Sequence, residues 1–162
     1  MGLFRNLGVN FLLMSLYDAE GYDVTPMVNT HAIVMDRALS GRFQQELEYN
    51  NVYLDFDDCL IVNGQVNIQI VAFIYQCISK KIGVHLLTRH KGEISESLER
   101  WRLGGVFDSV SHLRFDEHKS DYIKKEKAIF IDDSFAERLE VKSRLGIAVF
   151  APDSIESLVE WG

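Results

Sequence analysis

From residue 50 onward, short apolar runs that suit strands alternate with longer segments that suit helices. This alternation constrains the fold more than any other feature, because strands that are apolar on both faces are typical of a parallel sheet covered on both sides. The predicted strands are 52–56, 84–88, 109–115, 128–132 and 147–151. The predicted helices are 68–83, 93–105, 119–126, 134–146 and 153–161. Together they predict an α/β domain with a doubly wound, Rossmann-like parallel sheet flanked by helices.

Polar residues and glycines mark the ends of several of these elements. Asn63 and Gly64 stand between two short apolar runs, so residues 59–67 are predicted to form a tight hairpin. Ser134 can cap the helix that follows it, and Gly146 can end that helix.

Residues 1–49 lack this alternation and are predicted to form a separate, mainly helical N-terminal extension. The domain boundary is therefore placed between residues 1–49 and residues 50–162. The expected parts of the extension are a partly helical segment over 4–23, a loop over 22–31, and one or two helices over 30–49 interrupted near Gly41.

The charge balance limits the classes of partner. The 162 residues carry a formal net charge of −7, and the sequence pI is near 5.2. A nucleic-acid-binding surface is not expected, because phosphate backbones attract basic patches. The negative net charge does not exclude a small phosphorylated substrate, since a local basic cluster is enough to hold it.

Cysteine usage and the first residues give expectations about location. Cys59 and Cys77 have no metal-ligand spacing and make no disulfide framework, so a reducing cytoplasm is expected. The apolar run from Val9 to Tyr17 is too short to span a bilayer, and no small-residue cleavage site follows it. Neither a membrane anchor nor a signal peptide is therefore expected.

Several polar side chains stand where predicted strands end. They are Asp55 and Asp57 at the first strand, Thr88 at the second, Asp132 and Asp133 at the fourth, and Lys119 at the start of the short helix before the fourth. The carboxyl ends of parallel strands meet at one edge of a sheet, where ligands bind. We therefore expect these side chains to converge.

Crowded carboxylates repel one another and raise each other's pKa values, and a divalent cation removes that repulsion. Oxygen ligands without Cys or His partners favour Mg²⁺, which bridges to phosphate. Lys119 and the Thr88 hydroxyl suit the remaining phosphate oxygens as a point charge and a donor. An aspartate beside such a phosphate can attack phosphorus, and a second acid two residues later can protonate the leaving oxygen and then activate water.

Four segments in order resemble the haloacid dehalogenase superfamily of phosphohydrolases: "LDFDDCL", "LLTRH", "HKSDYI" and "FIDDS". The resemblance covers about residues 50–150. It implies that Asp55 is the nucleophile and Asp57 the general acid and base. The Mg²⁺ ligands that it implies are the Asp55 carboxylate, the Asp57 carbonyl and Asp132, with Asp133 as a further acid of the metal site. The phosphate-binding residues that we expect are Thr88, Lys119 and Arg89.

Two features depart from the superfamily's pattern. The second aspartate is commonly followed by Gly and Thr, whereas this chain has Asp58 and Cys59. Asp58 could alter the turn, and we expect a turn or capping residue there. Lys119 precedes Asp132 by only thirteen residues, which is a short interval. The rival lysines, which we expect to face solvent, are Lys124, Lys125 and Lys127.

Simpler interpretations stay open for several residues. Thr88 can merely cap the following helix, and Asp132 with Asp133 can cap the helix after them. Residues 89–91 form either a set of substrate contacts or a solvated loop. Arg138 is expected to face solvent on its helix or to pair with acidic neighbours there.

Cap domains in this superfamily insert after the first motif or between the second and the third. Both intervals are short here, so the resemblance is to a capless member with no large cap domain. An open site suits a bulky substrate, a partner protein that supplies a lid, or a lid made by the N-terminal extension. A homo-oligomer is a further alternative.

A receiver domain also uses aspartates, Thr and Lys. In a receiver domain the acidic pair comes on the first strand and the lysine comes last, whereas in this chain an acidic pair follows the lysine.

These features predict a Mg²⁺-dependent phosphatase that hydrolyses a phosphate monoester through an aspartyl-phosphate. The expected substrate is a small phosphorylated metabolite, with a phosphosugar as a guess from the superfamily. The alternative is a non-catalytic interaction or regulatory module of a larger biosynthetic system. Retention of all the acids and the lysine favours an enzyme, because a scaffold has no use for clustered like charge.

Overall fold

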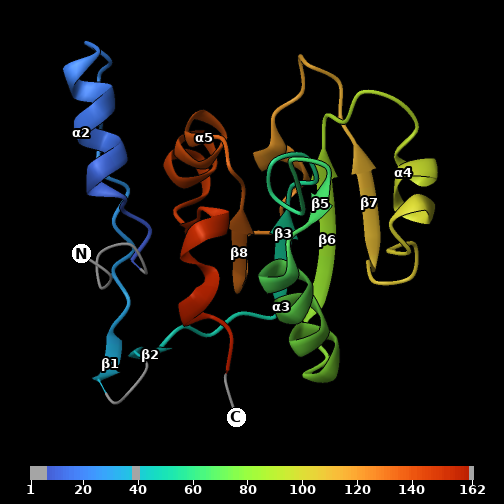
Figure 1. Ribbon diagram of the computed structural model, residues 1–162, viewed down its shortest axis with the longest axis horizontal. Helices are drawn as coiled ribbons and strands as arrows, with labels where there is room; N and C mark the ends of the chain where they lie inside the picture. Colours follow the sequence, from blue (N-terminus) through green and yellow to red (C-terminus); the bar gives the residue numbers. More distant parts are fainter. Residues whose placement is uncertain (1–6, 38–40, 161–162) are drawn as a thin grey trace.

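The computed structural model describes residues 7–37 and 41–160, and Figure 1 shows how its elements are arranged. A five-stranded sheet forms the centre, with the strand order β7-β6-β3-β8-β9 and parallel pairing throughout. Its strands are β3 (Asn51–Leu54), β6 (Gly83–Thr88), β7 (Ser109–His112), β8 (Ala128–Ile131) and β9 (Ala148–Phe150). The predicted doubly wound parallel sheet is confirmed.

A helix follows every strand of the central sheet along the chain. The α-helices are α2 (Phe11–Ala19), α3 (Ile68–Ser79), α4 (Ile94–Arg100) and α5 (Phe135–Leu145), and the 3₁₀ helices are η1 (Lys119–Tyr122) and η2 (Pro152–Ser157). The helices predicted over 119–126 and 153–161 are therefore shorter than expected. Ile123 already has extended backbone angles, which ends η1. Residue 161 lies outside the described part of the chain.

The two faces of the sheet bury different side chains. Val52 and Leu54 of β3 join a buried cluster with Phe73 of α3, whereas Tyr53 between them joins a second cluster with Val141 of α5. All five side chains are buried. Burying one such apolar side chain contributes about 1.5–3 kcal/mol. Packing on both faces therefore fixes the strand ends that carry the polar residues.

The predicted hairpin after β3 is confirmed. Its strands β4 (Ile61–Val62) and β5 (Gln65–Val66) pair antiparallel. Asn63 and Gly64 between them have φ values of 50° and 68°. Positive φ at both central residues is what a type I′ turn requires, and Asn-Gly is the sequence that adopts it most easily.

The N-terminal extension differs from the prediction. Residues 30–49 were predicted to be helical, but β1 (Ile33–Arg37) and β2 (Gly41–Gln45) pair as an antiparallel hairpin there. The helix prediction is therefore wrong. Ile33 and Val34 are β-branched and favour strands, and β2 contacts η2, so tertiary packing outweighs a weak local helix preference. The helix predicted within 4–23 is present as α2, although residues 4–6 lie outside the described part of the chain.

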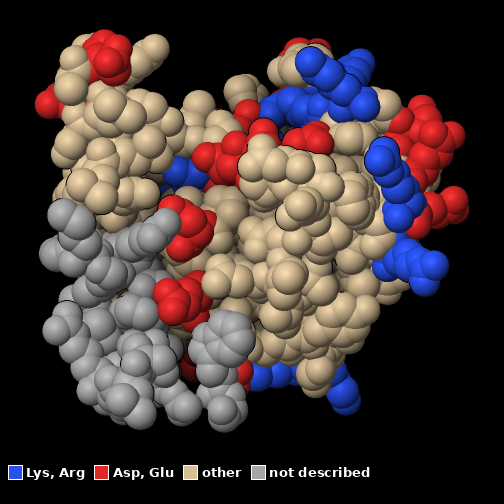
Figure 2. Space-filling model, viewed as in Figure 1, with Lys and Arg blue, Asp and Glu red and all other residues tan. Residues whose placement is uncertain are grey.

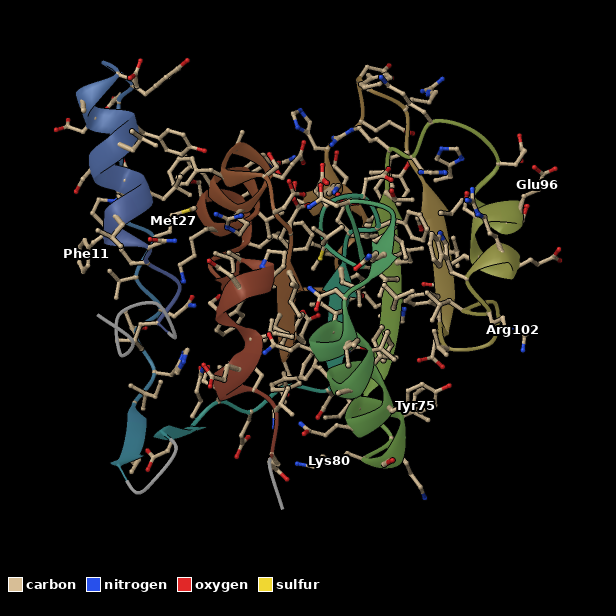
Figure 3. All side chains as sticks on the ribbon, viewed as in Figure 1. Phe11, Met27, Tyr75, Lys80, Glu96 and Arg102 are labelled. Atoms are coloured by element: carbon tan, nitrogen blue, oxygen red, sulfur yellow. The ribbon has the colours of Figure 1, made fainter. Side chains whose placement is uncertain are left out.

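The segments of the extension around Gly8 and Asn29 lie along the edge of the central sheet, beside β9. The Asn29 side chain donates from Nδ2 to the Val149 carbonyl at 2.8 Å and accepts at Oδ1 from the Val149 N–H at 3.1 Å. Met27 is buried, and Figure 3 shows that it points toward α5. An uncovered edge strand is open to pairing with another chain. The extension therefore covers this edge instead of hanging free.

Helix α2 packs little of its surface against the rest of the molecule. It has no buried residue, and Figure 3 shows Phe11 projecting away from the sheet. Its exposed large apolar side chains are Phe11, Leu12, Leu13, Leu16 and Tyr17. Among residues 7–37 and 41–160, no helix is long and apolar enough to cross a bilayer.

Candidate functional site

An acidic cluster forms at the carboxyl edge of the sheet. Leu54 at the end of β3 pairs with Ile131 at the end of β8, so the next residues, Asp55 and Asp132, leave neighbouring strands at the same level. Carboxylate oxygens of Asp55, Asp132 and Asp133 all lie within 4.8 Å of one another. The side chain of Asp132 is fully buried, and that of Asp55 is 13% exposed. The parallel register therefore creates the cluster that the strand ends predicted.

Lys119 places a buried cation against this cluster. Its Nζ donates to Asp132 Oδ2 at 2.6 Å and lies 3.1 Å from Asp55 Oδ1, and its side chain is only 2% exposed. Burial by itself lowers the pKa of Lys119, but the carboxylates of Asp132 and Asp55 raise it above its ordinary value, so the amine stays charged. The rival lysines that were expected to face solvent, Lys124, Lys125 and Lys127, are exposed.

The helix that carries Lys119 is anchored to α5. Ser120 Oγ donates to Glu140 Oε1 at 2.6 Å, and Arg144 Nη1 donates to both Ser120 Oγ and Glu140 Oε1. Arg144 Nη2 also donates to Asp121 at 2.7 Å. These contacts hold η1 in place and therefore keep the Lys119 amine over the carboxylates.

The carboxylates have the properties of a cation site. Asp55 Oδ1 is buried, and the described group that lies near it is the Lys119 amine, at 3.1 Å. Burial raises the pKa of Asp132, and burial together with Asp55 raises that of Asp133. A divalent cation would favour the ionised form of both. Carboxylate oxygens without sulfur or imidazole ligands suit Mg²⁺, so the residues present fit the ion that the sequence predicted.

Asp57 lies outside this group of three and is oriented by His90. Its carboxylate oxygens are 2.9 and 3.0 Å from His90 Nδ1, and His90 Nε2 is 2.8 Å from Ser97 Oγ. A carboxylate that has lost its proton can only accept, so in that state Nδ1 is the donor of this hydrogen bond. The Asp57 side chain is 52% exposed and can reach solvent or substrate. Its acid and base role, and that of its carbonyl at the metal, stay predictions.

Thr88 and Arg89 follow β6, the neighbour of β3. The buried Thr88 Oγ1 accepts from the His90 N–H at 3.1 Å, and its own hydroxyl hydrogen can still be donated to another acceptor. Its contact with phosphate stays a prediction. The Arg89 guanidinium donates to the carbonyls of Arg114 and Glu117 and pairs with Glu137. Its predicted phosphate contact would therefore require it to exchange protein acceptors.

Arg138 is a site residue that the sequence reasoning missed. It was expected to face solvent or acidic neighbours on its helix, which is wrong: it is 6% exposed, and its Nη1 donates to the carbonyls of Asp132 and Asp133 at 2.6 and 2.7 Å. Ser134 caps α5, so the position four residues later turns back toward the end of β8. Arg138 thereby fixes the backbone that presents two of the three cluster carboxylates.

Asp58 occupies a left-handed backbone position, with φ of 52°. Glycine takes such a conformation without strain, whereas aspartate tolerates it at a cost. The Asp58 N–H donates to the Ile61 carbonyl at 2.9 Å, so the residue shapes the turn as expected. Cys59 next to it is fully buried, and burial raises the pKa of its thiol well above the ordinary value.

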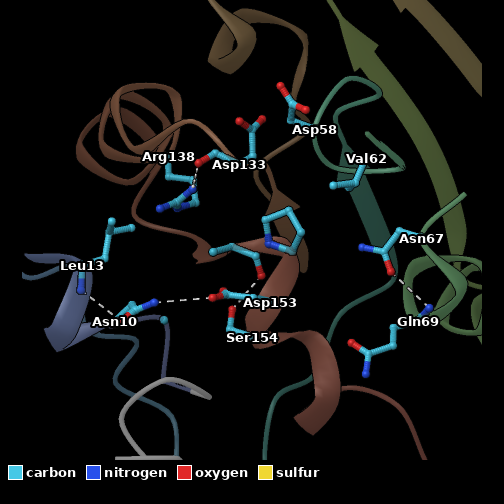
Figure 4. Close-up of a pocket in the computed structure, with 13 residues that line it drawn as sticks. Asn10, Leu13, Asp58, Val62, Asn67, Gln69, Asp133, Arg138, Asp153 and Ser154 are labelled. Carbon is cyan, nitrogen blue, oxygen red and sulfur yellow. Dashed lines mark hydrogen bonds between the residues drawn. The ribbon is translucent and has the colours of Figure 1, made fainter. Parts of the chain in front are cut away.

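A groove adjoins the acidic cluster (Figure 4). Its volume is about 420 Å³, and Asp58 and Asp133 stand at the end nearest the cluster. Figure 2 shows a hollow between α2 and the rest of the molecule, with acidic side chains along it. The site is therefore open on this side and partly walled by the N-terminal extension.

No family model and no curated protein matches this sequence. Among solved structures, a protein of unknown function from Corynebacterium glutamicum is 14% identical, with a TM-score of 0.46, covering 63% of this chain and 82% of its own. The core domain of a candidate phosphoglycolate phosphatase from Streptococcus pneumoniae is 12% identical, with a TM-score of 0.48, covering 65% and 80%. The N-terminal part of a Bacteroides fragilis protein, which contains a phosphatase domain complexed with Mg, is 14% identical, with a TM-score of 0.47, covering 70% and 40%. At these TM-scores the likenesses carry no argument about activity, which rests on the residues of the site.

Proposed function

We propose that this chain is a Mg²⁺-dependent phosphatase that hydrolyses a phosphate monoester through an aspartyl-phosphate. The observation that supports this most is the meeting of Asp55, Asp132 and Asp133 within 4.8 Å, with the buried Lys119 amine against two of them. Crowded carboxylates repel one another and cost stability, so their presence at one edge of the sheet favours a functional site.

The metal-holding residues in this proposal are Asp55, Asp132 and Asp133, with the Asp57 carbonyl. When bound, Mg²⁺ supplies positive charge to the phosphoryl oxygens and holds them in place. Lys119 and the Thr88 hydroxyl bind the other phosphoryl oxygens. Because Lys119 is held by two carboxylates, its position is set before substrate arrives.

In the first step, an Asp55 carboxylate oxygen attacks phosphorus, and the bond from phosphorus to the alcohol oxygen breaks. Asp57 gives its proton to that oxygen, and the neutral alcohol leaves. His90 holds the Asp57 carboxylate by a hydrogen bond of 2.9 Å and is anchored by Ser97. It acts as a positioning residue for the acid.

In the second step, Asp57 removes a proton from water as the water oxygen attacks phosphorus. The bond from phosphorus to Asp55 breaks, which releases inorganic phosphate and restores the Asp55 carboxylate. Asp57 ends protonated, ready for the next cycle.

Phosphate release from p-nitrophenyl phosphate and a hexose 6-phosphate, with and without Mg²⁺, tests this function. We expect Mg²⁺-dependent release that EDTA abolishes and that Asp55→Asn lacks. Equal rates of phosphate release for the wild type and Asp55→Asn would refute the proposed enzymatic function. Binding of Mg²⁺ and a phosphate analogue without turnover of either ester would support the alternative of a regulatory binding module.

We also propose a cytoplasmic location. Both cysteines of the chain are free and buried, which suits a reducing compartment.

A further inference from the structure

The groove beside the acidic cluster is a second feature with its own chemistry (Figure 4). It is about 420 Å³ in volume, which falls within the range of small-molecule sites. Four separate parts of the chain contribute side chains to it: the N-terminal extension, the loop between β3 and α3, the start of α5, and the turn after β9. Because Asp133 belongs both to the groove and to the cluster, the two sites are continuous.

The groove is acidic. Asp58, Asp133 and Asp153 line it, and Arg138 is the one cation among its described lining residues. The Arg138 guanidinium is buried, and its Nη1 donates to two backbone carbonyls, so a single cation that is held by the backbone faces three carboxylates. A ligand that carries an anionic group here therefore meets an excess of negative charge.

The groove suits hydroxyl groups and carbon chains instead. Carboxylates accept hydrogen bonds from hydroxyls, and Asp58 is exposed and makes no hydrogen bond to another described side chain. The Gln69 amide is exposed and can donate or accept. Leu13 and Pro152 add apolar surface for the C–H faces of a ligand.

The N-terminal extension supplies one wall. Asn10 Nδ2 donates to Asp153 Oδ2 at 3.5 Å, which ties the start of α2 to the turn after β9. Figure 4 shows Leu13 and Asn10 on one side of the groove, with Val62 and Asn67 on the other. The extension therefore does for the groove what a cap would do in a larger protein.

We propose, on the basis of the proposed function, that this groove holds the alcohol part of the ester and selects neutral polyhydroxy alcohols. Phosphate monoesters of sugars or sugar alcohols fit it, and esters that carry a second anionic group are rejected. Two like charges about 6 Å apart at a partly exposed site repel by enough to lower kcat/KM about tenfold or more. Because the groove contacts the alcohol in the bound state, the difference falls mainly in KM.

The test compares kcat/KM for sorbitol 6-phosphate, a hexose 6-phosphate, phosphoglycolate and fructose 1,6-bisphosphate at saturating Mg²⁺. We expect kcat/KM for the two neutral-alcohol esters to exceed that for the two esters with a second anionic group by about tenfold or more. Asp153→Asn should raise kcat/KM for the two esters with a second anionic group and so reduce that ratio several-fold. Glu156→Gln is the matched control, because Glu156 is an exposed acid on η2 outside the groove, and it should leave the ratio unchanged.

The outcomes separate the two proposals. Hydrolysis of p-nitrophenyl phosphate with no preference among the four esters would overturn the groove proposal and leave the phosphatase standing. A ratio that Asp153→Asn does not change would overturn it as well. Absence of turnover with every ester would overturn both.

Discussion

Lys119→Met removes the buried cation that lies between Asp55 and Asp132. In the wild type its Nζ is 3.1 Å from one carboxylate and 2.6 Å from the other, and the side chain is 2% exposed. Removing one partner of a buried ion pair leaves an uncompensated charge and costs about 3–5 kcal/mol. We therefore expect the free energy of unfolding at pH 8, without Mg²⁺, to fall by about that amount.

The loss should depend on pH. Burial raises the pKa of Asp132 above its unfolded-state value, whereas Lys119 lowers it, so the pKa rises further in the variant. When the pKa of a carboxyl group is higher in the folded state than in the unfolded state, the free energy of unfolding falls as the pH rises from the unfolded-state pKa to the folded-state pKa. The variant should therefore lose less stability at pH 5, where Asp132 carries a proton, than at pH 8.

Urea denaturation followed by circular dichroism measures these values. The matched control is Lys125→Met, which changes an exposed lysine and should shift the free energy of unfolding by less than about 0.5 kcal/mol. Mg²⁺ at pH 8 should restore part of the loss in Lys119→Met, because it replaces the missing positive charge. A loss below about 1 kcal/mol that is the same at both pH values would refute this electrostatic reasoning.

Three further expectations follow from other parts of the molecule. Asp58→Gly should raise the free energy of unfolding by about 0.5–1 kcal/mol, because glycine adopts φ of 52° without strain; a destabilised variant in urea titrations would contradict this. Asn29→Ala should cost about 1–3 kcal/mol, because both backbone groups of Val149 lose their partner, and an unchanged thermal midpoint would contradict that role. Burial raises the pKa of Cys59 well above the ordinary value and that of Cys77 to about 12. An aromatic disulfide reagent at pH 8 should therefore react with neither thiol until the protein is denatured. Fast labelling of the native protein would contradict this, because it would show that the thiols are accessible.

The central sheet and its polar edge could be predicted because both follow from local patterns. Apolar runs of strand length between helix-like segments determine a parallel sheet, and a parallel sheet brings its carboxyl ends to one edge. Asp55 and Asp132 are adjacent for that reason alone, since Leu54 and Ile131 before them are paired. The hairpin at Asn63 was equally local, because its turn type depends on two residues.

The features that were missed depend on contacts between distant residues. The strands β1 and β2 are stabilised by each other and by η2, which no pattern within residues 30–49 reveals. Arg138 is buried because the end of β8 offers it two carbonyls, and His90 reaches Asp57 across 33 residues of sequence. The groove likewise exists only because segments from both ends of the chain meet there.

Covalent trapping of the phosphoryl group on Asp55 addresses the proposed chemistry without relying on a natural substrate. In Asp57→Asn, p-nitrophenyl phosphate can still react, because nitrophenolate leaves without a proton, but the water step lacks its base. Rapid mixing with Mg²⁺ should then give a burst close to one nitrophenolate per protein and a phosphoryl group on the peptide that contains Asp55, and EDTA should abolish both. No burst and no phosphorylated peptide, or a phosphoryl group on another residue, would contradict the nucleophilic role of Asp55.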